Sequence, residues 1–116
     1  MAERTPRRIQ RRRTRGWRLP EGAVYVGRPT IYGNPFRVHP TWGPEFCRTP
    51  DEAVADFRAL MRVSLIRQAA LAPLRGHDLA CFCGLCPAHA DGLSLGVACP
   101  DCPPCHADVL LTLANA

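Results

Sequence analysis

Six of the seven cysteines in this 116-residue chain lie in one short segment, 81–105. Thiols this close together either pair as disulfides or share a metal ion. The cysteine count is odd, two pairs have C-x-x-C spacing, and no apolar signal segment follows the arginine-rich start. We therefore expect a reducing compartment, the cytoplasm, and a metal ion rather than a disulfide framework.

The two C-x-x-C pairs define the predicted metal site. Cys83 and Cys86 form the first pair, and Cys99 and Cys102 form the second. Zinc takes four tetrahedral ligands, and two thiolates three residues apart on a turn can both face one ion. The spacing predicts one zinc ion, held by these four cysteines, in a cysteine-rich loop over 83–105.

Other ligand sets remain open at this point. His89 follows Cys86 by three positions and can replace one of the four cysteines. A metal-free alternative is that several of these side chains are simply buried thiols. A different ligand set would consist of Cys81, Cys83, Cys105 and His106.

The net charge of +5 is concentrated at the N-terminus. A dense block of arginines repels itself and has little apolar surface to bury, so residues 1–16 are predicted to form a disordered arm. Arginines displace counterions from phosphates, and an aromatic ring can stack on bases, so we expect this arm to bind nucleic acid without reading its sequence. The residues expected to make these contacts are Arg11, Arg12, Arg13 and Trp17.

Residues 17–116 are predicted to form one small α/β domain. Apolar residues make up 47% of the chain, which is enough for a packed core. No apolar run approaches the roughly 18 residues that a membrane span needs, so we expect no membrane association. Apolar runs at 23–27 and 78–83 predict two strands, and a further short strand is expected at 36–39.

Two helices complete the predicted fold. Thr49, Pro50 and Glu52 have the spacing of a capping box, and apolar residues at helical spacing follow them. This pattern predicts an amphipathic helix of about 20 residues. A closing helix is predicted over 106–115. The long helix leaves room for a crossover between parallel strands, so the sequence favours a short, mainly parallel sheet.

Four motifs follow one another in a distinctive order. They are G-R-P at 27–29, G-N-P-F at 33–36, C-F-C at 81–83 and P-C-H-A-D-V-L-L at 104–111. Over residues 14–116 the chain resembles a family of domains of unknown function from bacteriophages and actinobacteria, which implies a bacterial cell or a phage-infected host. That family joins the strand to the closing helix by a short loop, whereas this chain carries an insertion with Cys86, Cys99 and Cys102. This departure from the family favours the other ligand set, which consists of Cys81, Cys83, Cys105 and His106.

An enzyme acting on a nucleotide or a nucleic-acid base is the alternative function. Ligands of α/β folds bind at the carboxyl ends of the strands, where five residues are expected to converge: Arg28, Asn34, Cys81, His106 and Asp108. A cysteine at a helix N-terminus beside a histidine is expected to have a lowered pKa and to act as a nucleophile. The candidate catalytic residues are Cys105, His106 and Asp108, with Arg28 and Asn34 binding the ligand. A phage-type modulator of protein interactions is the third option.

Overall fold

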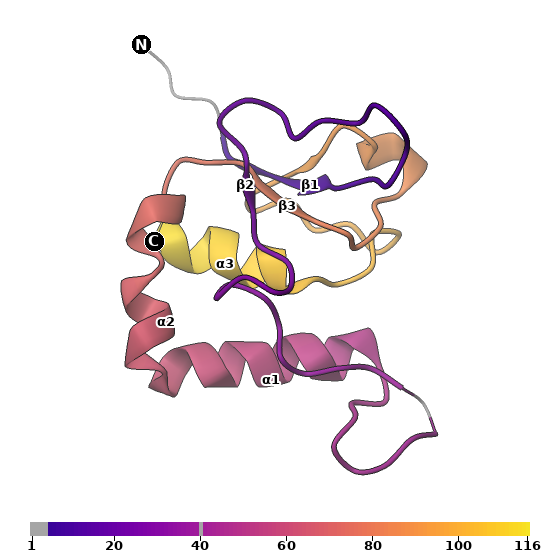
Figure 1. Cartoon of the computed structure of the whole chain (residues 1–116), viewed down its shortest axis with the longest axis vertical. Coiled ribbons are helices and arrows are strands. Elements are labelled where there is room, and N and C mark those ends of the chain that lie inside the picture. Colours follow the sequence, from indigo (N-terminus) through magenta and orange to yellow (C-terminus); the bar gives the residue numbers. More distant parts are fainter. Residues whose placement is uncertain (1–4, 40) are drawn as a thin grey trace.

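A four-stranded mixed sheet with strand order β2-β3-β1-β4 forms one side of the molecule (Figure 1). The structure is a computed structural model and describes residues 5–39 and 41–116. β3 pairs in parallel with both β1 and β2, and β4 pairs antiparallel with β1. The strands are β1 (Arg7–Gln10), β2 (Val24–Tyr25), β3 (Leu79–Cys81) and β4 (Leu93–Ser94).

Helix α3 lies between the sheet and α1, so the core is formed where these three layers meet (Figure 1). Leu79 of β3, Phe57 of α1 and Leu110 of α3 are almost completely buried there. The helices are α1 (Pro50–Val63), α2 (Leu65–Ala69) and α3 (His106–Ala114), with short 3-10 helices η1 (Ala72–Leu74) and η2 (Pro87–His89).

The predicted long helix begins where expected but is interrupted. The Thr49 hydroxyl accepts a hydrogen bond from the Glu52 amide at 3.2 Å, which caps the start of α1. Ser64 has extended backbone geometry, and its hydroxyl accepts a hydrogen bond from the Arg67 amide. A serine can cap a helix as well as continue one. The prediction of a single helix of about 20 residues is therefore wrong, and two helices meet at Ser64.

The strand predictions at 23–27 and 78–83 locate β2 and β3, which are shorter than the apolar runs. The strand expected at 36–39 is replaced by an isolated bridge between Val38 and Cys47. Two prolines and a glycine follow this segment in the sequence, and proline cannot donate to a strand ladder.

Residues 7–10 form β1, between β3 and β4, so the prediction that 1–16 form a disordered arm is wrong for this segment. Arg8 is fully buried and is held by two hydrogen bonds. One of its Nη atoms donates to Asp108 Oδ2, and the other donates to the Gly84 carbonyl, both at 2.8 Å. A buried arginine is tolerated when its charge is paired in this way. Residues 1–4 of the predicted arm lie outside the described residues.

Candidate metal centres

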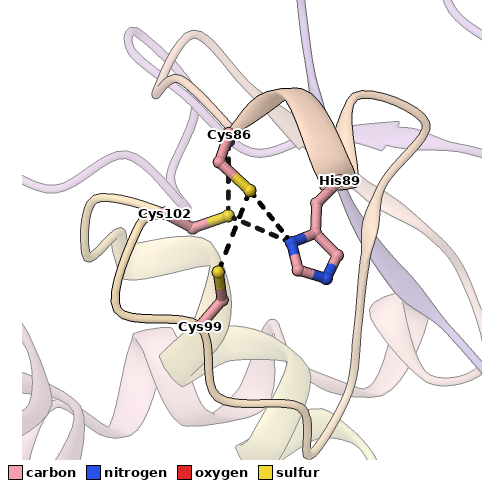
Figure 2. A group of neighbouring side chains, drawn as sticks. All are labelled: Cys86, His89, Cys99 and Cys102. Carbon is pink, nitrogen blue, oxygen red and sulfur yellow. Dashed lines mark hydrogen bonds between the residues drawn. The ribbon is translucent and has the colours of Figure 1, made fainter.

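One cluster brings together a histidine and three cysteines from two neighbouring turns (Figure 2). Cys86 directly precedes η2, and His89 is its last residue. Cys99 and Cys102 lie on the turn that precedes α3. Their four ligand atoms all lie within 4.8 Å of one another. Cys86 Sγ is 3.1 Å from His89 Nδ1 and 3.8 Å from Cys99 Sγ, and Cys102 Sγ is 3.6 Å from His89 Nδ1.

Two of these three spacings fit a tetrahedral metal ion, and the third, between Cys86 Sγ and His89 Nδ1, is shorter. Zinc–sulfur bonds of about 2.3 Å and zinc–nitrogen bonds of about 2.0–2.1 Å place tetrahedral sulfurs about 3.8 Å apart and sulfur and nitrogen about 3.5 Å apart. The Cys86–Cys99 and Cys102–His89 spacings match these two values. The hydrogen bond between Cys86 Sγ and His89 Nδ1 also lowers the pKa of the Cys86 thiol to about 7, which favours the thiolate that a metal requires.

The predicted ligand set is corrected at one position. Cys86, Cys99 and Cys102 lie together as expected, but Cys83 belongs to another cluster, and His89 takes the fourth place. Cys83 follows β3 by two residues and lies with Cys105 at the start of α3 rather than with Cys86. The C-x-x-C spacing alone could not assign Cys83 to the second cluster, because each of the two clusters contains a cysteine next to a turn.

A second cluster consists of Cys81, Cys83 and Cys105, whose sulfurs lie within 4.8 Å of one another. Cys81 is the last residue of β3, and Cys83 follows two positions later, where an extended chain returns a side chain to the same face. Cys105 is the N-cap of α3, and its sulfur accepts a hydrogen bond from the Ala107 amide at 3.4 Å. The Cys81 and Cys105 sulfurs are 2.9 Å apart, and both cysteines are free.

The pKa of the Cys83 thiol is lowered, whereas the pKa values of the Cys81 and Cys105 thiols are raised. Hydrogen bonds from the Cys105 and Cys81 thiols lower the pKa of Cys83. The hydrogen bonds of Cys105 with Cys81 and Cys83, together with its burial, raise the pKa of Cys105 well above its usual value. The predicted lowering of the Cys105 pKa is therefore wrong, because its neighbours oppose the effect of the helix N-terminus.

His106 lies beside this cluster with a defined tautomer. A carbonyl oxygen can only accept, so the 2.8 Å contact of Nε2 with the Val26 carbonyl assigns the proton to Nε2. Nδ1 is then unprotonated and lies 3.6 Å from Cys105 Sγ. Burial lowers the pKa of the His106 imidazole and favours this neutral form.

A cavity of about 570 Å³ opens next to the second cluster. The Arg28 guanidinium is oriented there by hydrogen bonds from Nε to the Asn34 carbonyl at 2.7 Å and from Nη2 to the Phe36 carbonyl at 3.3 Å. Asp108 does not line this cavity, because its carboxylate pairs with Arg8. The sequence-predicted residues that line the cavity are Arg13, Arg28, Asn34, Cys81, Cys83, Cys105 and His106.

The arginines after β1 lie against aromatic rings near this cavity. The Arg11 guanidinium is 4.4 Å from the centre of the Tyr25 ring, and the Arg13 guanidinium is 4.5 Å from the centre of the Phe82 ring. Arg12 is exposed and Trp17 is half-buried. The two rings were missed from the sequence because Tyr25 ends β2 and Phe82 follows β3, and the strand β1 that brings the arginines to them was not expected.

Residues 9–116 match a family described as a domain of unknown function (DUF4326). The chain belongs to this family. The match to DUF4326 includes both cysteine clusters, the cavity and the second half of β1. No curated protein and no solved structure matches the chain. Among the described residues, no helix is long and apolar enough to cross a membrane.

Proposed function

We propose that this DUF4326 protein is a zinc-stabilised domain in which Cys86, His89, Cys99 and Cys102 hold a structural zinc ion. The observation that carries this proposal is the convergence of all four ligand atoms within 4.8 Å. Thiolate and imidazole ligands suit zinc, and four protein ligands close the coordination sphere, which is the pattern of structural sites.

The ion would fasten the segment between β3 and α3. This segment has little regular structure of its own, apart from η2 and the two residues of β4. β4 pairs with β1, so an ion that orders the segment also supports one edge of the sheet. Structural zinc contributes roughly 10–16 kcal/mol in small peptides, which is ample for ordering a loop of this size.

Metal analysis of untagged protein tests this proposal. Cys99→Ser should lose about one zinc equivalent per chain relative to wild type, because it removes one of four ligands. Cys47→Ser is the matched control, since Cys47 is a free cysteine whose thiol bonds to Asp56 Oδ2, away from the cluster. Unchanged zinc content in a folded Cys99→Ser protein would contradict the assignment.

A second proposed activity is sequence-independent binding of single-stranded nucleic acid. The observation that favours it is the mixed surface on which Arg11 and Arg13 lie over Tyr25 and Phe82. Guanidinium groups bind phosphates, and their planes and aromatic rings both provide stacking faces for bases. The Arg11 amide donates to the Cys81 carbonyl at 2.7 Å, so this surface is anchored to the sheet.

Fluorescence anisotropy with labelled single-stranded DNA of mixed sequence at several salt concentrations tests this second activity. Replacing both Arg11 and Arg13 with alanine should weaken binding and reduce the salt slope by about 0.7 for each lost phosphate contact. The control replaces Arg58 and Arg62, two exposed arginines of α1, and so removes the same charge elsewhere. Equal loss of affinity in the two double variants would show that only net charge matters and would contradict a defined surface.

A further inference from the structure

We propose that Cys81, Cys83 and Cys105 hold a second divalent metal ion of the zinc class, whose fourth coordination position opens into the cavity and accepts an anionic, nucleotide-like ligand. This site uses none of the ligands of the Cys86 cluster and does not depend on nucleic-acid binding by the arginines. The two centres would then differ in kind, one closed by four protein ligands and one open.

The three sulfurs come from rigid parts of the fold. Cys81 ends β3 between two parallel neighbours, and Cys105 caps α3, which begins with the buried residues His106 and Ala107. The Ala107 amide donates to Cys105 Sγ at 3.4 Å, which fixes this sulfur at the start of the helix. An ion would move the Cys81 and Cys105 sulfurs from 2.9 Å to about 3.8 Å apart, which is the tetrahedral spacing.

The charges around the cluster favour a metal bound by three thiolates. Three thiolates and one divalent cation carry a net charge of −1, which needs a cation nearby. Arg8 supplies it, because its side chain is 1% exposed and donates to the carbonyl of Gly84, the residue after Cys83, and to Asp108, in the first turn of the helix that Cys105 caps. Its ion-pair partner Asp108 has a side chain that is 40% exposed and is therefore partly screened by water.

The cavity provides the open coordination position. All three cysteines line it, and a zinc site with three protein ligands characteristically leaves the fourth position to water or substrate. By contrast, no residue of the Cys86 cluster lines this cavity. A volume of about 570 Å³ is in the range of small-molecule sites, so a ligand can reach the ion.

The cavity walls determine the class of ligand. Arg13 and Arg28 contribute positive charge, and none of the described residues that line the cavity is acidic. Tyr25, Phe36 and Phe82 provide aromatic surface beside them. Guanidinium groups recognise phosphate, and rings stack on flat heterocycles, so the walls suit a nucleoside phosphate.

Cobalt(II) substitution tests the second centre, because tetrahedral thiolate-bound cobalt absorbs strongly in the visible range. Wild-type protein should bind two cobalt ions per chain, and Cys83→Ser should lose one of them while keeping the other. Cys99→Ser should lose the other ion, so failure of either centre is read separately. Cys83→His, which restores a ligand, should recover the lost ion with a shifted spectrum, and this guards against simple misfolding.

AMP is the probe for the open position. Adding AMP should change the cobalt d–d bands of wild-type protein and leave those of Cys83→Ser unchanged, and Arg28→Ala should weaken the AMP effect at least tenfold. Bands that do not respond to AMP would overturn the open position and its ligand. Retention of both cobalt ions by Cys83→Ser, or a Cys81–Cys105 disulfide in freshly purified protein, would overturn the second centre.

Discussion

Arg8 is a buried cation that joins the first strand to the last helix. Its side chain contacts Asp108 of α3 and the Gly84 carbonyl, far away in the sequence. Burial works against its charged form, yet the pKa of Arg8 is raised, because the negative charges that Cys105 and Asp108 carry when ionised lie close to it. One side chain therefore links the sheet, the second cluster and α3.

Replacing Arg8 with methionine should lower the free energy of unfolding by about 2–3 kcal/mol. Losing one partner of a fully buried ion pair costs about 3–5 kcal/mol, and the cost is smaller here because the Asp108 side chain is 40% exposed. Urea unfolding followed by circular dichroism measures the change. Arg12→Met is the control, because Arg12 is exposed and its replacement should change stability by less than about 0.5 kcal/mol. Similar stabilities of the two variants would contradict the role of Arg8.

At the scale of elements, β1 holds the sheet together, because it lies between β3 and β4. Ile9 is 8% exposed and pairs in register with Ala80. The strand is short, and its sequence is dominated by charge, so its stability comes from its neighbours rather than from its own composition.

Ile9→Ala should therefore destabilise the protein by about 2–4 kcal/mol, the usual cost of truncating a buried aliphatic side chain. Ile31→Ala is the matched control, because Ile31 is 46% exposed and should lose far less stability. Thermal and urea unfolding of both variants provide the comparison. If Ile9→Ala is as stable as Ile31→Ala, β1 is not part of the folded core.

The cap of α1 gives a second prediction at this scale. Thr49→Ala removes the hydroxyl that accepts the Glu52 amide and should cost about 1 kcal/mol. Thr49→Ser keeps an acceptor and should retain most of the stability. Equal losses in the alanine and serine variants would show that the methyl group, not the hydroxyl, stabilises this helix start.

Local signals in the sequence were sufficient for much of this fold. The capping residues Thr49 and Pro50 located the start of α1, and short apolar runs located β2 and β3. β1 could not be found in this way, because the reason that Arg8 is buried is a contact with Asp108. Such long-range pairing leaves no local pattern.

The metal sites show the same limit. The sequence indicated that Cys86, Cys99 and Cys102 belong together, and it identified His89 as a rival ligand. The choice between Cys83 and His89 depends on the path of the chain after β3, which the C-x-x-C spacing does not record. The cavity followed from the rule that ligands of α/β folds bind at the carboxyl ends of the strands, but the pairing of Asp108 with Arg8 did not.

For the whole molecule, the structure separates a packed core from a segment that depends on metal. The core formed by Phe57, Leu79 and Leu110 does not involve the Cys86 cluster. Loss of that ion should therefore open the segment 86–102 and leave α1 and α3 folded.

Hydrogen exchange measured by mass spectrometry checks this separation. In Cys99→Ser, amides within 86–102 should exchange faster than in wild type, whereas those of α1 should stay protected. Cys47→Ser should match wild type throughout. Uniformly faster exchange across α1 and the loop would mean that the ion supports the whole fold rather than one segment.

Anomalous diffraction at the zinc absorption edge, on crystals of untagged protein, tests the central claim most directly. The account predicts a zinc peak bonded to the sulfurs of Cys86, Cys99 and Cys102 at about 2.3 Å and to His89 Nδ1 at about 2.0–2.1 Å. A well-ordered loop with these four side chains in place and no anomalous peak among them would contradict it.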